Sequence, residues 1–133
     1  MIGDVIGELT GKIIGERIVR HHHGEVLFEK TMESKGKIFG MEMTLFATMK
    51  VRERPQGGMY AKGHGVLLTA TGEKVILEGS GITVPAKDHM SMRGMRFAQT
   101  TIPALARLNN AGLAFEIEMM KDGTVRDKMW EWK

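Results

Sequence analysis

The sequence contains no cysteine and only three prolines, and its aromatic residues are limited to five phenylalanines, two tryptophans and one tyrosine. The absence of cysteine excludes disulfides, thiol nucleophiles and thiolate metal sites, as is typical of proteins from a reducing compartment. No window approaches the roughly 20 apolar residues that a membrane-spanning helix needs. The N-terminal stretch MIGDVIGELTGK also lacks the charged start and apolar run of a signal peptide. We therefore expect a cytoplasmic protein without a membrane span.

The sequence also has little excess charge of either sign, because 19 basic and 16 acidic residues give a net charge of only +3. The two signs are interspersed along the chain, and no basic stretch alternates with aromatic residues as a nucleic-acid platform would require. We predict no nucleic-acid partner. A chain of 133 residues buries roughly two thirds of its unfolded surface, so its core needs no metal or disulfide. We expect one globular domain, residues 1–133, with no cofactor and no metal.

The sequence has 17 glycines and frequent turn signals, separated by stretches in which apolar and polar residues alternate. Alternation with period two predicts strands. The predicted strands cover residues 9–20, 25–34, 37–53, 58–70, 73–83, 90–100, 111–121 and 124–132. One short helix, Pro103 to Leu108, is predicted between the sixth and seventh strands, because proline starts helices and the following asparagine pair ends them. Closing the sheet removes exposed edges, so we predict an all-β fold, an eight-stranded antiparallel up-and-down barrel.

The turns determine which side chains share a face of the sheet, because each hairpin fixes a register. We predict a two-residue turn at Lys35-Gly36, a four-residue loop at residues 54–57 and a two-residue turn at Thr71-Gly72. All three place apolar side chains on one face, which we interpret as the interior. The predicted inward residues include Phe39, Met43, Leu45, Met49, Val75 and Leu77.

A fourth turn, Asp122-Gly123, is predicted to join the last two strands with a two-residue loop. This register places Leu113, Phe115, Ile117 and Met119 inside beside Trp130 and Trp132. Paired carboxylates are able to act as general acid and base, but four of them on a polar face are more often a solvated surface. The carboxylates predicted to face solvent are Glu116, Glu118, Asp127 and Glu131.

Several polar residues are predicted on the inward face, namely Lys30, Tyr60, Lys62 and His64, together with either Arg93 or Arg96. Buried charges are costly unless they are paired or used, and Gly79 and Gly81 lie opposite this group. These features favour a pocket for an anionic, apolar ligand such as a fatty acid, with Met49 and other methionines forming a pliable wall. Two alternatives stay open: the lysines reach solvent at the rims while His64 is a satisfied core histidine, and the methionines are ordinary core packing.

Four stretches carry a resemblance to a known group of proteins: GHGVLLTATGEKVILEGSGI, RGMRFAQT, LARLNNAGLAFEIE and the ending KMWEWK. Together they resemble a family of uncharacterised small prokaryotic barrels that is similar to allene oxide cyclase-type barrels. The similarity covers residues 36–133. It implies a calycin-like, eight-stranded barrel with an internal cavity. No stretch matches the cyclase catalytic motif, so the resemblance assigns no catalytic residue.

Three functional hypotheses follow. The first is a small-molecule-binding barrel that uses Lys30, Tyr60, Lys62 and His64 to hold the head of an apolar, anionic ligand. The second is a cofactor-independent isomerase or cyclase in the same cavity, with His64 as general base and Tyr60 or Lys62 stabilising an oxyanion. The third is a structural or assembly role as a homo-oligomer that covers exposed apolar residues, namely Leu27, Ile38, Phe46 and Ile76.

The stretch His21-His22-His23-Gly24 draws attention as a possible metal site. Adjacent histidines in an extended chain point to opposite faces, so they do not converge on one ion. We predict a three-residue loop from His22 to Gly24, with Gly24 in the left-handed conformation and Glu16 beside Lys30. A shared or adventitious metal at the rim stays open as the alternative.

Overall fold

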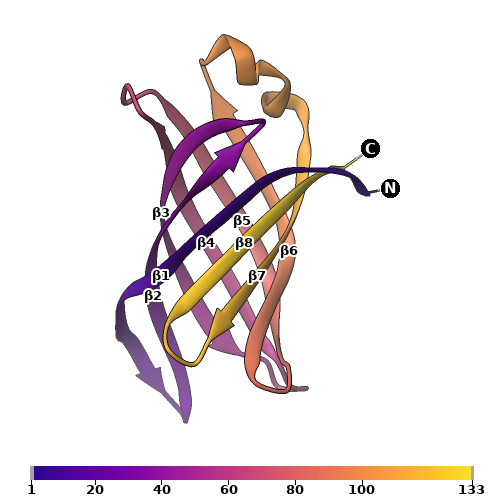
Figure 1. The fold of residues 1–133 in the computed structure, drawn as a ribbon. Coiled ribbons are helices and arrows are strands. Elements are labelled where there is room, and N and C mark those ends of the chain that lie inside the picture. The colour runs from indigo at the N-terminus through magenta and orange to yellow at the C-terminus, as the bar shows by residue number, and fades with distance from the viewer. Residues whose placement is uncertain (1, 133) are drawn as a thin grey trace.

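The computed structural model describes residues 2–132, which form a closed eight-stranded antiparallel barrel (Figure 1). Each strand pairs with its neighbours in sequence, and the first strand closes on the last. The predicted fold class is confirmed, including one short helix between the sixth and seventh strands. The elements are β1 (Ile2–His22), β2 (Glu25–Ile38), β3 (Met41–Glu53), β4 (Met59–Thr69), β5 (Lys74–Pro85), β6 (His89–Thr100), η1 (Pro103–Asn110), β7 (Gly112–Met120) and β8 (Thr124–Trp132).

The first hairpin is the longest, because β1 starts at Ile2 and not near residue 9 as predicted. Register shifts between Ile13 and Gly15 and between Ile18 and Arg20 interrupt its pairing with β2. Such bulges bend a strand and increase its twist, which allows a 21-residue strand to follow the barrel wall. Figure 1 shows the β1–β2 hairpin extending beyond the other turns at the lower end of the barrel.

The turn between β2 and β3 lies at Phe39-Gly40, so the predicted turn at Lys35-Gly36 is wrong. Phe39 and Gly40 have φ values of 49° and 76°, and positive φ at both central residues is what a two-residue hairpin favours. The pairing moves by an even number of residues, so Met43 and Leu45 still face inward. Phe39 itself is an exposed turn residue, and Ile38, which was predicted to be exposed, is completely buried.

The loop between β3 and β4 spans residues 54–58, one residue longer than predicted. Gly57 and Gly58 both have positive φ, and this freedom accommodates the extra residue. Glu53 therefore pairs with Met59, and a one-residue shift turns every side chain of a strand to the other face. The predicted inward placement of Tyr60, Lys62 and His64 is wrong. The inward residues of β4 are Met59, Ala61, Gly63, Gly65 and Leu67.

The next loop, residues 70–73, is also longer than the predicted two-residue turn. In the β4–β5 register, Leu67 pairs with Val75 and Gly65 pairs with Leu77. This second shift by one residue cancels the shift of β4, so β5 has the inward face that was predicted. Val75 and Leu77 are buried in the core, as predicted. Gly79 and Gly81 also face inward, as the sequence indicated.

The loop between β7 and β8 has three residues, 121–123, where the sequence predicted two. Gly123 has a φ of 91°, and its N–H donates to the carbonyl of Met120 over 3.1 Å. A three-residue loop with glycine in the left-handed region is a standard hairpin connection. The β7 residues face inward as predicted, but β8 is turned over. Trp130 and Trp132 face outward, whereas Val125, Asp127, Met129 and Glu131 face the interior.

The helix η1 lies at the upper end of the barrel in Figure 1. It is a 3-10 helix with proline in its first turn, a position that suits the fixed φ and the missing N–H of proline. Leu105 and Leu108 are each only 1% exposed and belong to the same core cluster as Val75 and Leu113. Their burial gives the barrel one end sealed by apolar side chains.

Candidate functional site

A buried ion pair lies in the barrel interior between β6 and β8. The Arg96 guanidinium donates two hydrogen bonds to the Asp127 carboxylate, over 2.8 Å and 2.6 Å. Arg96 also lies over the Phe115 ring, 4.2 Å from the ring centroid. A bidentate guanidinium–carboxylate pair satisfies both charges where water is scarce. Of the two predicted candidates, Arg96 is therefore the inward residue, and Arg93 faces outward and pairs with Glu116 over 2.9 Å.

Sequence reasoning missed Asp127, which it placed on the solvent side with Glu131. Both carboxylates are buried, at 2% and 9% exposure. The extra residue in the 121–123 loop is the cause, because it turns the whole of β8 over. One signal was available: an inward Arg96 needs an inward carboxylate, and the predicted interior offered none on the neighbouring strands.

A cavity of about 50 Å³ borders Arg96. Its inward walls are mostly apolar and come from strands β2 to β7, with Met32, Leu45, Leu77 and Phe115 among them. Met49, which was predicted to line the pocket, also borders it. The space is that of a small group, such as a carbonyl, a methyl branch or one or two water molecules.

Glycines of β4 and β5 form one part of the cavity wall, which we call the glycine wall. Gly63, Gly65 and Gly79 border the cavity. A Cβ atom on Gly79 would lie 2.5 Å from the Met95 carbonyl oxygen, and one on Gly81 would lie 2.7 Å from that of Arg93. Close approach of the neighbouring strand therefore requires glycine here. Gly79 borders the cavity, whereas Gly81 faces inward but does not border it.

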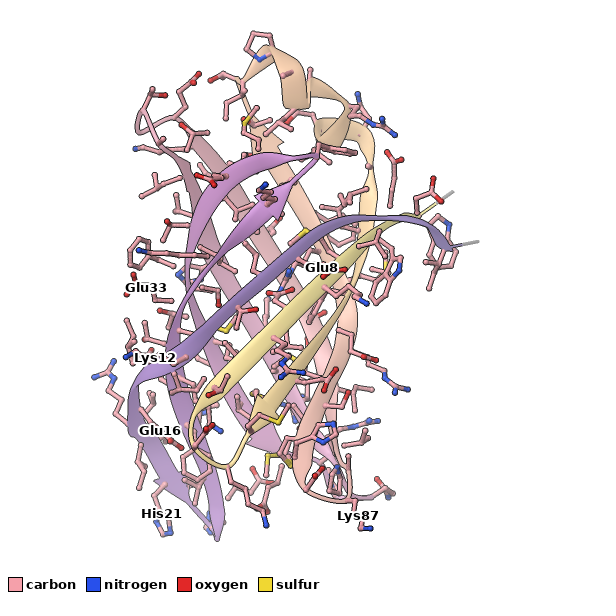
Figure 2. The ribbon with its side chains drawn as sticks, viewed as in Figure 1. Glu8, Lys12, Glu16, His21, Glu33 and Lys87 are labelled. Carbon is pink, nitrogen blue, oxygen red and sulfur yellow. The ribbon has the colours of Figure 1, made fainter. Side chains whose placement is uncertain are left out.

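The lower end of the barrel is an opening of about 600 Å³. We call this opening the methionine mouth, because half of the twelve methionines line it: Met49, Met59, Met90, Met92, Met119 and Met120. Met49 and Met92 also border the small cavity, so the mouth and the cavity adjoin. Figure 2 shows Glu16 and Lys87, which line the mouth, at this end of the barrel. The lining of the mouth therefore combines methionines with charged side chains, and two of its methionines also border the cavity.

Lys30 is the predicted site residue that the structure places in the mouth. It pairs with Glu16 in the β1–β2 register, as predicted. The Lys30 Nζ lies 4.0 Å from Glu16 Oε1, and its side chain is 29% exposed. An ammonium with such a distant partner retains donors for another anion. Lys30 is therefore the inward cation with the greatest capacity to bind a ligand, since Arg96 is already engaged by Asp127.

The other predicted head-group residues lie on the outer wall. Lys62 and His64 are exposed, and Tyr60 is half-buried with the Arg52 guanidinium 5.1 Å from its ring centroid. His64 borders the small cavity from the outer side of the glycine wall, together with Thr48 and Glu78. An outward imidazole does not reach a substrate inside the barrel, so His64 is not positioned as the general base of an interior reaction.

The histidine stretch is the tip of the β1–β2 hairpin (Figure 2, His21). His22 pairs with Glu25, so the turn contains two residues, His23 and Gly24, and the predicted three-residue loop is wrong. Gly24 has positive φ, as predicted, and His23 shares this conformation. The rings of His22 and His23 meet edge to face with centroids 3.9 Å apart. Within residues 2–132, no three histidine or carboxylate side chains converge as metal ligands would.

Two loop carboxylates at the mouth have perturbed acidity. Hydrogen bonding to the His89 ring, 3.0 Å away, lowers the pKa of Asp88 below its usual 3.8. The backbone N–H of Thr124, which donates to Asp122 Oδ1 over 2.9 Å, lowers the pKa of Asp122 in the same way. A bond that favours the charged form makes a carboxyl group more acidic. Both groups are therefore negative at neutral pH.

No family model and no curated protein matches the sequence. Among the described residues, no helix is both long and apolar enough to cross a membrane. Solved structures do share the fold. A conserved protein of unknown function from Rhodopseudomonas palustris is similar with a TM-score of 0.81 and 14% identity, covering 98% of this chain and 97% of that one.

Two further structures show the same barrel. A protein of unknown function from Clostridium acetobutylicum is similar with a TM-score of 0.82 and 13% identity over 98% of each chain. An enzyme from Penicillium herquei is similar with a TM-score of 0.63 and 12% identity, covering 98% of this chain and 96% of that one. At such identities the likeness establishes the fold alone. The chain is thus an eight-stranded barrel of a type found in uncharacterised bacterial proteins and in at least one fungal enzyme.

Proposed function

We propose that this protein is a small-molecule-binding barrel that takes an apolar ligand with one anionic end through the methionine mouth. The observation that carries the proposal is that the mouth and the small cavity adjoin and share Met49 and Met92 as lining residues. Within residues 2–132, η1 covers the other end of the barrel with the buried Leu105 and Leu108, so we place the entrance for a ligand at the mouth. Ligand sites in barrels commonly lie at such a mouth.

The chemistry of the walls supports an apolar body. Thioether side chains are unbranched and polarizable, so they adapt to ligands of varied shape. The interior charge of Arg96 is neutralised by Asp127, which makes the deep cavity suited to an uncharged group. The anionic end is therefore assigned to Lys30 at the mouth, where the partner Glu16 is distant and half-exposed. The sequence resemblance to allene oxide cyclase-type barrels, which implies an internal cavity, is part of this proposal.

The first experiment asks whether a ligand is retained. Native mass spectrometry of protein purified from its own host is expected to show a bound small molecule, and a panel of fatty acids and isoprenoids is expected to raise the melting temperature. Each compound of the panel that stabilises the protein is then recovered and analysed. A binding protein returns the compound unchanged, whereas an isomerase or cyclase returns it with an altered structure. An unliganded protein that no member of the panel stabilises would contradict the proposal.

The second experiment asks whether Lys30 recognises the anionic end. Lys30→Gln is expected to weaken binding of dodecanoate about tenfold and to leave binding of dodecanol nearly unchanged, because only the carboxylate forms a charge-assisted bond. Lys12→Gln is the matched control, since this exposed lysine lies on the same strand pair and outside the mouth. An equal loss of affinity for dodecanoate and dodecanol would show that Lys30 does not recognise the carboxylate.

A homo-oligomer is the second candidate, and one surface feature favours it. Phe46, Val66 and Ile76 are cross-strand neighbours on the outer wall, and Phe46 and Ile76 are 42% and 52% exposed. A second copy of the chain would remove this apolar row from water. Light scattering is expected to give a dimer mass that Phe46→Lys reduces to that of a monomer. A monomeric mass for the unmodified protein at high concentration would exclude this candidate.

A further inference from the structure

The outer wall carries a second concave surface, which we call the outer basic groove. It has a volume of about 710 Å³ and lies on β1 to β6, on the opposite side of the glycine wall from the small cavity. Its cations are Arg20, Lys50, Arg52 and Lys62, with His64 beside them. Three of its residues, Tyr60, Lys62 and His64, are those that sequence analysis had placed inside the barrel.

The strand register brings these side chains together. Lys50 and Lys62 are directly opposite each other on β3 and β4. In the neighbouring cross-strand row, Arg20 is opposite Leu27, which in turn is opposite Arg52. Directly opposite residues on one face have Cβ atoms about 5 Å apart. The fold thus holds two ammonium groups and two guanidinium groups in adjacent rows of one surface.

The lysine pair is unusual because like charges directly opposite each other destabilise a sheet. Among the carboxylates of residues 2–132, none lies within ion-pair distance of Lys50, Arg52 or Lys62. The cations elsewhere in the fold that do have such partners include Arg17, Arg93, Arg96 and Arg107. On its other side Lys50 is directly opposite Glu29 of β2, but this carboxylate is engaged by Arg17. The lysine pair is therefore only partly compensated within the chain, and an external anion would offset the remaining repulsion.

The groove also contains two carboxylates, which limit its positive charge. Glu29 is engaged by Arg17 at 3.0 Å, and Glu78 pairs with His64 in the β4–β5 register. Four cations against two carboxylates leave the groove positive. The whole chain has a net charge of only +3, so much of its excess charge is concentrated on this surface.

We propose that the outer basic groove binds a small molecule that carries a phosphate or diphosphate group. A phosphate dianion placed between Lys50 and Lys62 would turn their repulsion into attraction, because each ammonium would face the same anion. Arg52 is held against the Tyr60 ring and supplies planar donors for a second phosphate. The hydroxyl groups of Thr48 and Ser80 border the same groove and add neutral donors.

This site is independent of the methionine mouth. The groove and the mouth share no lining residue, and the glycine wall separates the groove from the small cavity. Binding at the groove therefore does not rest on the proposed binding of an apolar ligand, and each activity is measurable without the other.

The test uses inorganic pyrophosphate as the probe in isothermal titration calorimetry of the full chain at low salt. The unmodified protein is expected to bind one pyrophosphate, and sodium chloride is expected to weaken this binding because exposed charges are screened. Lys50→Gln/Lys62→Gln is expected to weaken binding at least about tenfold. The same variant is expected to melt at an equal or higher temperature, since it removes the repulsion between two exposed lysines.

The matched control is Lys35→Gln/Lys37→Gln, which removes the same charge from exposed positions of β2 outside the groove. This variant is expected to bind pyrophosphate within about twofold of the unmodified protein. Arg52→Gln, a single change in the groove, is expected to weaken binding to an intermediate extent. No binding of pyrophosphate at millimolar concentration, or equal weakening in the two double variants, would overturn the proposal.

Discussion

The two ends of the barrel are built in opposite ways. At the closed end, η1 buries Leu105 and Leu108, and Arg107 donates two hydrogen bonds to Glu131. At the open end, six methionines surround an opening, and the inward cation Lys30 has only a distant partner. Apolar sealing and bidentate pairing give stability, whereas adaptable side chains and a loosely paired charge give access. This difference is the reason that the proposed ligand site is placed at the open end, while the closed end is expected to contribute more to stability.

The largest expected effect is the loss of stability when the buried Arg96–Asp127 pair is broken, and it is compared with breaking the Lys30–Glu16 pair at the mouth. Arg96→Ala leaves Asp127 buried without a partner, and it is expected to lower the free energy of unfolding by about 3–5 kcal/mol. Lys30→Ala at the open end is expected to change it by no more than about 1 kcal/mol, because Glu16 is half-exposed. Urea denaturation measures both values.

A double replacement tests the reason for that loss. Arg96→Met/Asp127→Leu removes both charges together and is expected to recover most of the stability, because no lone charge stays buried. If the single and double variants were equally unstable, the loss would come from packing and not from an unpaired carboxylate.

The second prediction concerns apolar packing at the two ends. Leu105→Ala in η1 is expected to cost about 2–5 kcal/mol, since it leaves a cavity beneath a fully buried side chain. Met59→Ala at the mouth is expected to cost clearly less, because Met59 is only partly buried. Thermal unfolding of both variants provides the comparison. A larger loss of stability for Met59→Ala would show that packing at the mouth, and not at η1, contributes more to the stability of the barrel.

A smaller effect is expected for the ion pair of the closed end. Arg107→Ala removes two hydrogen bonds from the buried Glu131 carboxylate, but the Arg107 side chain is 55% exposed and its charge is screened. The expected loss is about 1 kcal/mol. Glu131→Gln keeps a hydrogen-bond acceptor and serves as the conservative comparison in the same denaturation series. A loss as large as that of Arg96→Ala would show that this end is held by charge and not by apolar packing.

The smallest effect is a pH dependence at the mouth. The folded-state pKa of Asp122 is below 3.8 because the Thr124 N–H bonds to its carboxylate. This bond contributes stability above the unfolded-state pKa, and the contribution disappears as the pH falls through the folded-state value. Asp122→Ala is therefore expected to be less stable than the unmodified protein at pH 7 and equal to it at the acid end of the titration. A difference that persists in acid would trace the loss to turn geometry alone.

The sequence predicted the fold because strand alternation and turn signals are local properties. It also identified Lys30 beside Glu16, Met49 and the inward faces of β2, β3, β5 and β7. It misplaced β4 and β8 because register depends on the number of residues in a loop, and the Gly57-Gly58 and Asp122-Gly123 sequences each allow more than one loop length. One added residue in the loop 54–58 moved His64 outside, and one added residue in the loop 121–123 moved Asp127 inside. These two shifts changed the candidate site more than any error in strand boundaries.

The methionines themselves provide the most direct measurement of whether the open end binds an apolar ligand, as we propose. With ¹³C-methyl-labelled methionine, a titration with dodecanoate followed by NMR is expected to shift the signals of the mouth, from Met49, Met59, Met90, Met92, Met119 and Met120. The signals of Met41, Met43, Met95 and Met129, which line neither the mouth nor the cavity, are expected to stay in place. Shifts confined to this second group, or no saturable shift at all, would contradict the account.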